Sequence, residues 1–151
     1  MRKLFFVLML AVAQSYAATT VYMDGATGTK GGILKTGLHW TAPQPVTSTA
    51  MQFTITYNTA DFTNVSITPG GDITMPKKNL TCSPGNGTLS CVVWAMSDTP
   101  IVVGYSLGTI TMEVSATAHS TSTVYVTNPL GSSASGQIVI LTSRSAVMTL
   151  Q

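Results

Sequence analysis

The sequence predicts an all-β protein whose two sheets pack face to face, a sandwich of about nine strands with jelly-roll topology. Charged residues make up only 8% of the chain and hydrophobic residues 44%, which excludes a disordered chain. Short apolar runs alternate with threonine and serine at the period of two that is typical of half-buried strands. Turn residues separate these runs, and no long segment has the 3.6-residue period of a helix.

Residues 1–17 have the features of a secretory signal peptide. Arg2 and Lys3 give a positive start, an apolar run of about ten residues follows, and Ser15-Tyr16-Ala17 fits a small-x-small cleavage site. The apolar run is too short to span a bilayer, and no later segment is long and apolar enough to do so. We therefore expect cleavage after Ala17 and one domain over 18–151. This domain is expected outside the cell, at the cell surface or in the periplasm.

Residues 18–151 carry no net charge, because the formal charge of +2 belongs to Arg2 and Lys3. Lys77 and Lys78 form the only cationic pair of this region and are expected at a solvated edge. A neutral chain lacks the positive field that holds phosphates, so a nucleic-acid partner is not expected. The charged residues of 18–151 are Lys30, Lys35, Lys77, Lys78 and Arg144 against Asp24, Asp61, Asp72, Asp98 and Glu113.

The first strands are expected at 18–23 and 33–40, on either side of a glycine-rich loop at 24–32. This loop has neither the spacing of a phosphate-binding loop nor the acidic positions of a calcium loop, so no cofactor is expected there. In the second strand Leu34, Leu38 and Trp40 share a face. Gly37 indicates a bulge or a close crossing of two chain segments. A proline-rich connection covers 41–49.

The clearest strand signal lies at 51–57, where Met51, Phe53, Ile55 and Tyr57 alternate with polar residues. A turn follows at 58–62, since Asn and Asp side chains bond nearby backbone groups. The next strand has Val65 and Ile67 on one face and ends at Pro69-Gly70-Gly71. Residues 72–79 are expected to form a short strand and a loop at Pro76.

Residues 80–96 are expected to form a hairpin around Pro84-Gly85-Asn86-Gly87. Cys82 and Cys91, the only cysteines, fall on opposite arms of this hairpin. A signal peptide directs the chain to an oxidising compartment, so we expect a cross-strand disulfide between them. A redox or metal-binding pair would need a C-x-x-C spacing or further ligands.

The later strands are expected at 109–116, 120–128, 137–141 and 146–150, after a loop at 97–103. Together with Phe-x-Ile-x-Tyr at 53–57 and Val-x-Ile-Thr-Pro-Gly at 65–70, these motifs resemble the cohesin-like family of secreted β-sandwiches, in order and over nearly all of 18–151. The resemblance implies the jelly-roll fold. The residues expected in the core are Phe53, Ile55, Val65, Ile67, Val93, Ile110, Met112, Val114, Val124 and Ile138.

No catalytic, metal or cofactor site is expected. The two histidines, His39 and His119, have no Cys, Asp or Glu nearby at ligand spacing. There is no G-x-S-x-G segment to hold a serine nucleophile. Asp61 and Asp98 are expected to be turn residues rather than a pair of catalytic carboxylates.

The resemblance implies an interaction module, because cohesins bind dockerins and so attach enzymes to scaffolds and cell surfaces. One alternative is a carbohydrate-binding module for polysaccharide, which needs exposed aromatic rings. The candidates for such stacking are Trp40, Tyr57, Trp94, Tyr105 and Tyr125. Trp94 and Tyr125 fall on the outward register of their strands. The same rings could instead fill the core. A third alternative is a self-associating subunit of a filament or adhesin, which an unpaired apolar terminal strand would indicate.

Overall fold

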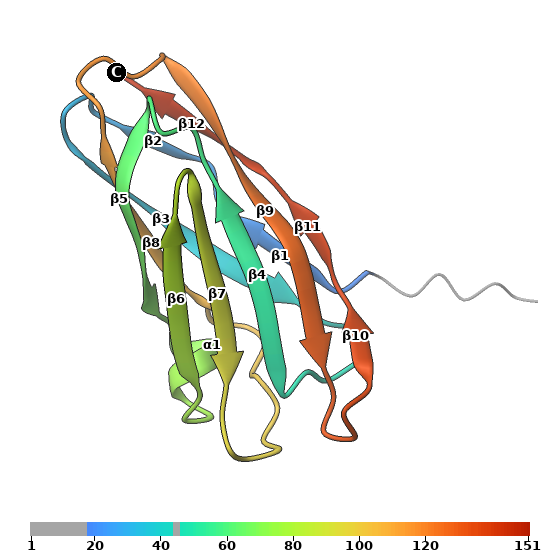
Figure 1. Cartoon of the computed structure of the whole chain (residues 1–151). Helices are drawn as coiled ribbons and strands as arrows, with labels where there is room; N and C mark the ends of the chain where they lie inside the picture. The colour runs from blue at the N-terminus through green and yellow to red at the C-terminus, as the bar shows by residue number, and fades with distance from the viewer. Residues whose placement is uncertain (1–17, 44–45) are drawn as a thin grey trace, which may run out of the picture.

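The structure is a computed structural model that describes residues 18–43 and 46–151; the predicted signal peptide at 1–17 lies outside the described residues. Within them the chain forms twelve strands and one short helix, and the strands make two sheets that pack face to face (Figure 1). The all-β sandwich predicted from the sequence is confirmed.

The smaller sheet has five strands in the order β11-β1-β3-β8-β5. They are β1 (Thr20–Met23), β3 (Ile33–Thr41), β5 (Phe62–Pro69), β8 (Gly108–Val114) and β11 (Thr142–Arg144). Its central strand β3 alternates along its length, with Leu34, Leu38 and Trp40 buried and Lys35 exposed. That alternation places one side of the sheet in the core and the other in solvent.

The larger sheet has the order β2-β12-β9-β4-β7-β6, and β10 also pairs with β9. Its strands are β2 (Ala26–Gly28), β4 (Ala50–Thr56), β6 (Asn79–Gly85), β7 (Thr88–Trp94), β9 (Thr121–Ser132), β10 (Ile138–Ile140) and β12 (Ala146–Leu150). Figure 1 shows this sheet from outside, with the β6–β7 hairpin beside β4 and β9. The predicted hairpin and the strand predicted at 51–57 are both found.

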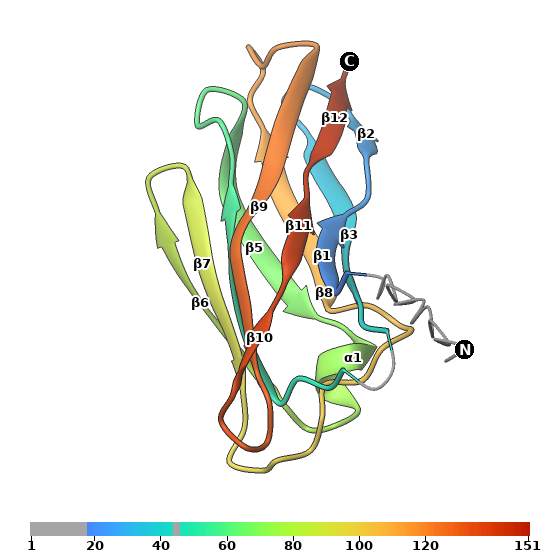
Figure 2. The same cartoon turned by 90° about the vertical axis from the view of Figure 1, so that its right-hand side faces the viewer.

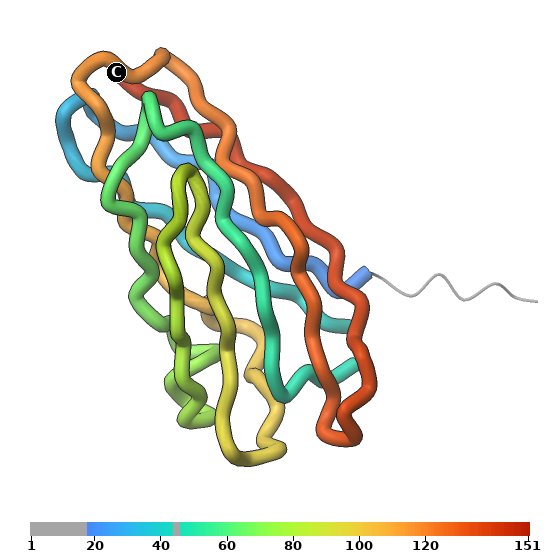
Figure 3. Tube along the Cα trace, viewed as in Figure 1, coloured from blue at the N-terminus to red at the C-terminus, as the bar shows by residue number. Residues whose placement is uncertain are grey.

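Both ends of the described chain contribute strands to both sheets. β1 belongs to the smaller sheet and pairs in parallel with β11, whereas β2 belongs to the larger sheet and pairs in parallel with β12. The last segment runs along the whole length of the sandwich and switches sheets as it goes (Figures 2 and 3). This switching divides the terminal segments into short pieces, which is why there are twelve strands rather than about nine.

The segment predicted as a short strand at 72–79 is instead the helical turn α1 (Gly71–Thr74). The Asp72 carboxylate accepts a hydrogen bond from the Tyr105 backbone N–H at 2.8 Å, and Ile73 is buried below it. Burial raises the pKa of Asp72, against the opposing effects of this hydrogen bond and of the nearby His39 side chain. The turn therefore closes one end of the sandwich (Figure 1).

Lys78, expected at a solvated edge, is buried, and its ammonium donates a hydrogen bond to the Ser97 carbonyl at 3.0 Å. Burial lowers the pKa of Lys78, and the nearby Asp98 opposes this effect. The aliphatic part of the side chain fills space beside α1 while its charged end reaches a backbone acceptor.

The core lies between the two sheets and contains the predicted residues, with Ile138 as the exception. Phe53, Ile55 and Ile110 are at most 2% exposed, and Ile67 is partly buried against them. Ile138 is 70% exposed, because alternation along β10 turns Val139 inward and its two neighbours outward. The prediction for Ile138 was therefore wrong by one residue in register.

Cys82 and Cys91 form a disulfide, as predicted, with their Cα atoms 4.1 Å apart. The two residues are direct partners in the β6–β7 ladder, and Cys91 is buried against Phe53 on β4. The bond thus joins the edge strand β6 to the interior of the larger sheet.

We expect that replacing both cysteines by serine lowers the free energy of unfolding by roughly 2–3 kcal/mol, because the unfolded chain regains the freedom of a short loop. Urea denaturation of the wild type and the double variant measures this difference. A reducing agent should destabilise the wild type to the same extent and leave the variant unchanged. Equal stability of the two proteins would contradict the prediction.

Candidate functional site

Trp40 does not present its ring to a ligand. It is 3% exposed, and its indole Nε1–H donates a hydrogen bond to the Val102 carbonyl at 2.9 Å. The register that it shares with Leu34 and Leu38 places all three in the core. This corrects the expectation that Trp40 could stack on a sugar.

Trp94 and Tyr125 do point outward, with 42% and 50% of their surfaces exposed. They are far apart, however, because Tyr125 pairs with Thr56 at one end of β4, while Val93, next to Trp94, pairs with Met51 at the other. Five residues of strand correspond to roughly 17 Å. The two rings therefore do not form one stacking surface.

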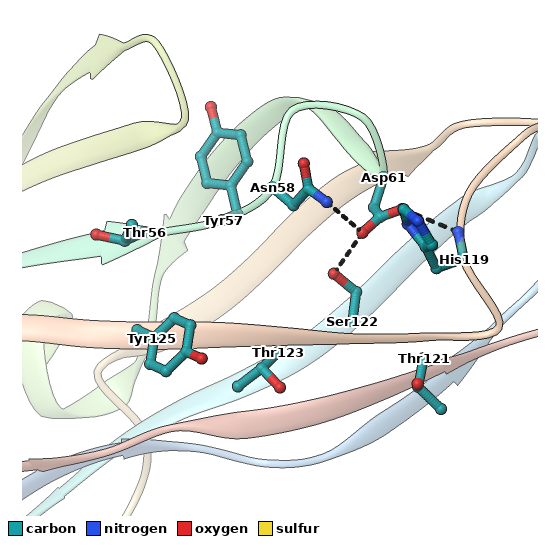
Figure 4. Close-up of a pocket in the computed structure, with 9 residues that line it drawn as sticks. All are labelled: Thr56, Tyr57, Asn58, Asp61, His119, Thr121, Ser122, Thr123 and Tyr125. Atoms are coloured by element: carbon teal, nitrogen blue, oxygen red, sulfur yellow. Dashed lines mark hydrogen bonds and ion pairs between the residues drawn. The ribbon is translucent and has the colours of Figure 1, made fainter.

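An open hollow of about 510 Å³ lies beside Tyr125, at the end of the sandwich where β4 turns into β5. Figure 4 shows the rings of Tyr57 and Tyr125 on one side of it and Asp61 with His119 on the other. The hollow is lined by Thr56, Tyr57, Asn58, Asp61, His119, Thr121, Ser122, Thr123 and Tyr125.

Asp61 is 2% exposed and accepts four hydrogen bonds at the base of this hollow. The backbone N–H and the Nδ1 of His119 lie 2.9 and 2.8 Å from Oδ1, and the Ser122 hydroxyl and the Asn58 amide lie 2.7 and 3.0 Å from Oδ2. Burial raises the pKa of Asp61, but the hydrogen bonds from His119 and Ser122 outweigh it and hold the pKa below its ordinary value.

The arrangement of Asp61, His119 and Ser122 is structural rather than nucleophilic. In a catalytic triad the hydroxyl donates its proton to the imidazole, whereas here the hydroxyl and the imidazole both donate to the same carboxylate. Asp61 thus fastens the turn after β4 to the connection that precedes β9 (Figure 4). The sequence places His119 far from Asp61, so local spacing could not predict their contact.

A second polar cluster lies on the outside of the smaller sheet, around His39. Its Nε2 lies 2.9 Å from the Asp24 carboxylate and its Nδ1 lies 3.3 Å from the Tyr105 carbonyl. Its ring stacks on that of Tyr22, which in turn carries the Arg144 guanidinium 4.6 Å from its centroid.

Gly37 makes room for this cluster. A Cβ at Gly37 would lie 2.5 Å from His39 Nε2 and 2.7 Å from Asp24 Oδ2, which explains the close crossing predicted there. Sequence spacing missed the His39–Asp24 contact, because the β1–β3 pairing brings the two residues together. Among the described residues, no three His, Cys, Asp or Glu side chains are grouped so that they could hold a metal ion.

The outside of the larger sheet carries several exposed apolar side chains. We call the outward side chains of β10, β9, β4, β7 and β6 the β4 face. At the end near α1, Val92, Trp94 and Leu130 are 44%, 42% and 37% exposed. Ile138 and Ile140 extend this surface on β10, and a shallow hollow of about 140 Å³ lies between Val92 and Leu130.

The strand register brings these residues into rows that cross the sheet. Ile140 lies opposite Leu130, Leu130 opposite Gln52, and Gln52 opposite Val92. Directly opposed residues share a face, so Ile140 and Leu130 are neighbours, and only Gln52 lies between Leu130 and Val92. The run Val92-Val93-Trp94 could have indicated this exposed apolar surface from the sequence, because it places hydrophobic residues on both sides of one strand.

We expect Asp61→Asn to lower the free energy of unfolding at neutral pH by about 2–3 kcal/mol, because the Asn amide would face donors that need an acceptor. The pKa of Asp61 is lower in the folded than in the unfolded chain, so the ionised carboxylate stabilises the fold. This contribution is complete above about pH 4, the pKa of an unfolded aspartate, and is lost as the pH falls through the pKa of the folded state. The gap between wild type and variant should therefore narrow on acidification.

Urea denaturation at a series of pH values between neutral and acid measures this gap. Asp98→Asn is the matched control, because Asp98 is exposed and solvent screens its attraction to the Lys78 ammonium, so the substitution should cost no more than about 1 kcal/mol. A gap that stays constant or widens in acid would contradict the assignment.

In the described part of the chain, no helix has the length and apolar character needed to cross a membrane.

Comparisons with known proteins agree with this architecture. The fold is similar to a type I cohesin–dockerin complex from Clostridium thermocellum, with a TM-score of 0.76 and 10% identity over 91% of this chain and 98% of that one. The third ScaC cohesin of Acetivibrio cellulolyticus has a TM-score of 0.75 and 17% identity, covering 87% and 98% of the two chains. A non-cellulosomal cohesin from Archaeoglobus fulgidus has a TM-score of 0.73 and 11% identity, covering 89% and 92%.

A comparison with curated proteins gave no significant match. The profile of the Cohesin domain family, in contrast, matches residues 19–149. That range contains every strand of both sheets except the last residue of β12. The chain therefore belongs to the Cohesin domain family, as its strand motifs indicated.

Proposed function

We propose that this protein is a secreted, non-catalytic binding module whose β4 face takes a protein partner of the dockerin type. Two solved structures of similar fold are cohesins in complex with dockerins, both from Clostridium thermocellum. The family membership supports a protein-binding role, and the geometry of the β4 face supports its location.

The observation that carries the proposal is the group of neighbouring apolar side chains at one end of the β4 face. Val92, Trp94 and Leu130 are partly exposed there, and Ile138 and Ile140 are almost fully so. Contiguous exposed apolar surface of this kind, with polar residues around it, is typical of protein interaction sites. An exposed Trp beside a shallow hollow is the type of residue that dominates binding energy at interfaces.

The outside of the smaller sheet is a poorer candidate. Lys35 and Glu113 project from its central strands, and Glu113 is bonded to Asn64 at 2.7 Å. Ile33 is the exposed apolar residue there, at 64%, and it pairs with Glu113. A charged, hydrated surface costs more to dehydrate than the β4 face.

The proposal that the partner is a protein rather than a polysaccharide rests on the aromatic side chains. Trp40 is buried, and Trp94 and Tyr125 lie at opposite ends of β4. A donor strand for filament assembly would have to be unpaired, whereas β1, β2, β11 and β12 each pair with a neighbour within the described residues.

Secretion forms part of the proposal. The charged start, apolar run and small-x-small site of residues 1–17 support removal of a signal peptide. The Cys82–Cys91 disulfide is consistent with an oxidising compartment.

We expect Trp94→Ala to weaken binding to a type I dockerin by at least about 30-fold, the factor that corresponds to the loss of a hot-spot residue. Titration calorimetry with a panel of type I dockerins, including that of the Clostridium thermocellum complex, measures the dissociation constant. Ile33→Ala is the matched control, because it truncates an exposed apolar residue on the other sheet.

Binding that is equally strong in the wild type and Trp94→Ala would place the interface elsewhere. A wild-type protein that binds no dockerin of the panel but binds an array of polysaccharides would contradict the proposed function itself.

We also expect the protein recovered from the culture medium of its expressing cells to begin at Ala18. Intact-mass measurement and N-terminal sequencing check the cleavage site. A mature chain that retains residues 1–17 would contradict secretion by this route.

A further inference from the structure

We infer that the β4 face selects a partner surface without charged groups and rejects charged ones. This inference rests on the proposed function, because it specifies the chemistry of the partner at the same face. It follows from the distribution of charge over the two sheets.

All ten charged residues of 18–151 lie outside the strands of the larger sheet. Lys35, Glu113 and Arg144 are on the smaller sheet, and Asp61 and Asp72 are buried in turns. Lys77, Lys78 and Asp98 lie beyond the ends of β6 and β7, where Lys77 and Asp98 are exposed and the Lys78 ammonium is bonded to the Ser97 carbonyl. The outward side chains of the β4 face are Gln52, Thr54, Thr56, Asn79, Thr81, Ser83, Thr88, Ser90, Val92, Trp94, Thr121, Thr123, Tyr125, Thr127, Leu130, Ile138 and Ile140.

Many of the polar side chains on this face bond one another. The Thr54 and Ser90 hydroxyls lie 3.2 Å apart, the Thr56 and Thr127 hydroxyls lie 3.3 Å apart, and Trp94 Nε1 donates to the Thr81 hydroxyl at 3.2 Å. These pairs satisfy part of the hydrogen-bonding capacity of the face before any partner arrives. They leave a surface that offers neutral dipoles but no counter-charge.

A charged partner group buried against such a surface would lose its water without gaining an ion pair. Burial of an unpaired charge costs several kcal/mol, which is more than a good apolar contact returns. An uncharged partner meets no such penalty. The β4 face therefore distinguishes partners by disfavouring charged ones. Specificity of this kind needs no additional attractive contact with the uncharged partner.

The rows of the face also orient the partner. The apolar end around Val92, Trp94 and Leu130 fits aliphatic and aromatic side chains, whereas the hydroxyl-rich middle around Thr54 and Ser90 fits neutral hydrogen-bonding groups. Because no charges steer the encounter, association should depend little on ionic strength.

The test uses a phage-displayed library of one scaffold with randomised surface positions. It is selected on the full mature protein in the presence of excess Trp94→Lys variant, so that only binders to the β4 face are kept. We expect the selected clones to carry at most about half of the library's frequency of Asp, Glu, Lys and Arg, in line with the charge depletion of interface cores. Charged residues above that level would overturn the inference.

Two substitutions of Gln52 give the second readout. Gln52→Glu adds a negative charge to a side chain of nearly the same shape at the centre of the face, and Gln52→Lys adds a positive one. We expect each to weaken the selected binders by about tenfold or more, while Thr109→Glu and Thr109→Lys on the exposed side of β8 do not. An unchanged or tighter complex with either Gln52 variant would overturn the inference.

The third measurement is the dependence of binding on salt concentration. Between about 50 and about 500 mM NaCl we expect the dissociation constant of the selected binders to change less than about threefold, and a larger change would overturn the inference. If no dockerin binds, the proposed function is contradicted but the inference about charge is not. The library selection still determines whether the β4 face accepts charged or uncharged partner surfaces.

Discussion

Successive side chains of an extended strand point to opposite faces, so the residues on one side of β4 determine which residues lie on the other. Met51, Phe53 and Ile55 must face the core, so Gln52, Thr54 and Thr56 must face outward. A shift of one residue in pairing would exchange the two sets and bury three polar side chains. The register of the larger sheet is therefore held by its hydrophobic interior, and the positions of the rows on its outside follow from the same constraint.

This coupling explains how a small β-sandwich can present a defined surface. Each strand that contributes to the interior contributes equally to the exterior, and the Cys82–Cys91 bond fixes the edge strand at the same register. The Asp61 network fastens the loops at one end, and α1 closes the other. The outward side chains can then differ in charge and polarity while the inward side chains keep the packing of a β-sandwich core.

The fold was easier to predict from the sequence than the site, because the signals for the strands lie close together in the sequence. Alternation, the Asn-Gly turn and the two cysteines are all read within a few residues, so β4 and the β6–β7 hairpin were predicted well. The contacts of Asp61 with His119 and of His39 with Asp24 depend on which strands become neighbours. Alternation also shows which residues share a side of a strand, but not which side faces the core. For that reason the core position of Trp40 was left open, and Ile138 was placed on the wrong side.

The pairing of both chain ends has a consequence for the order of events during synthesis. Thr20 pairs with Thr142 and Ala26 with Met148, so β1 and β2 lack these partners until β11 and β12 have been synthesised. Contacts between such distant segments form slowly, because a long loop must close first. One side of the sandwich therefore stays open while the chain is still growing. The edges of β1 and β2 that β11 and β12 cover therefore stay unpaired for most of the time that the domain takes to be synthesised.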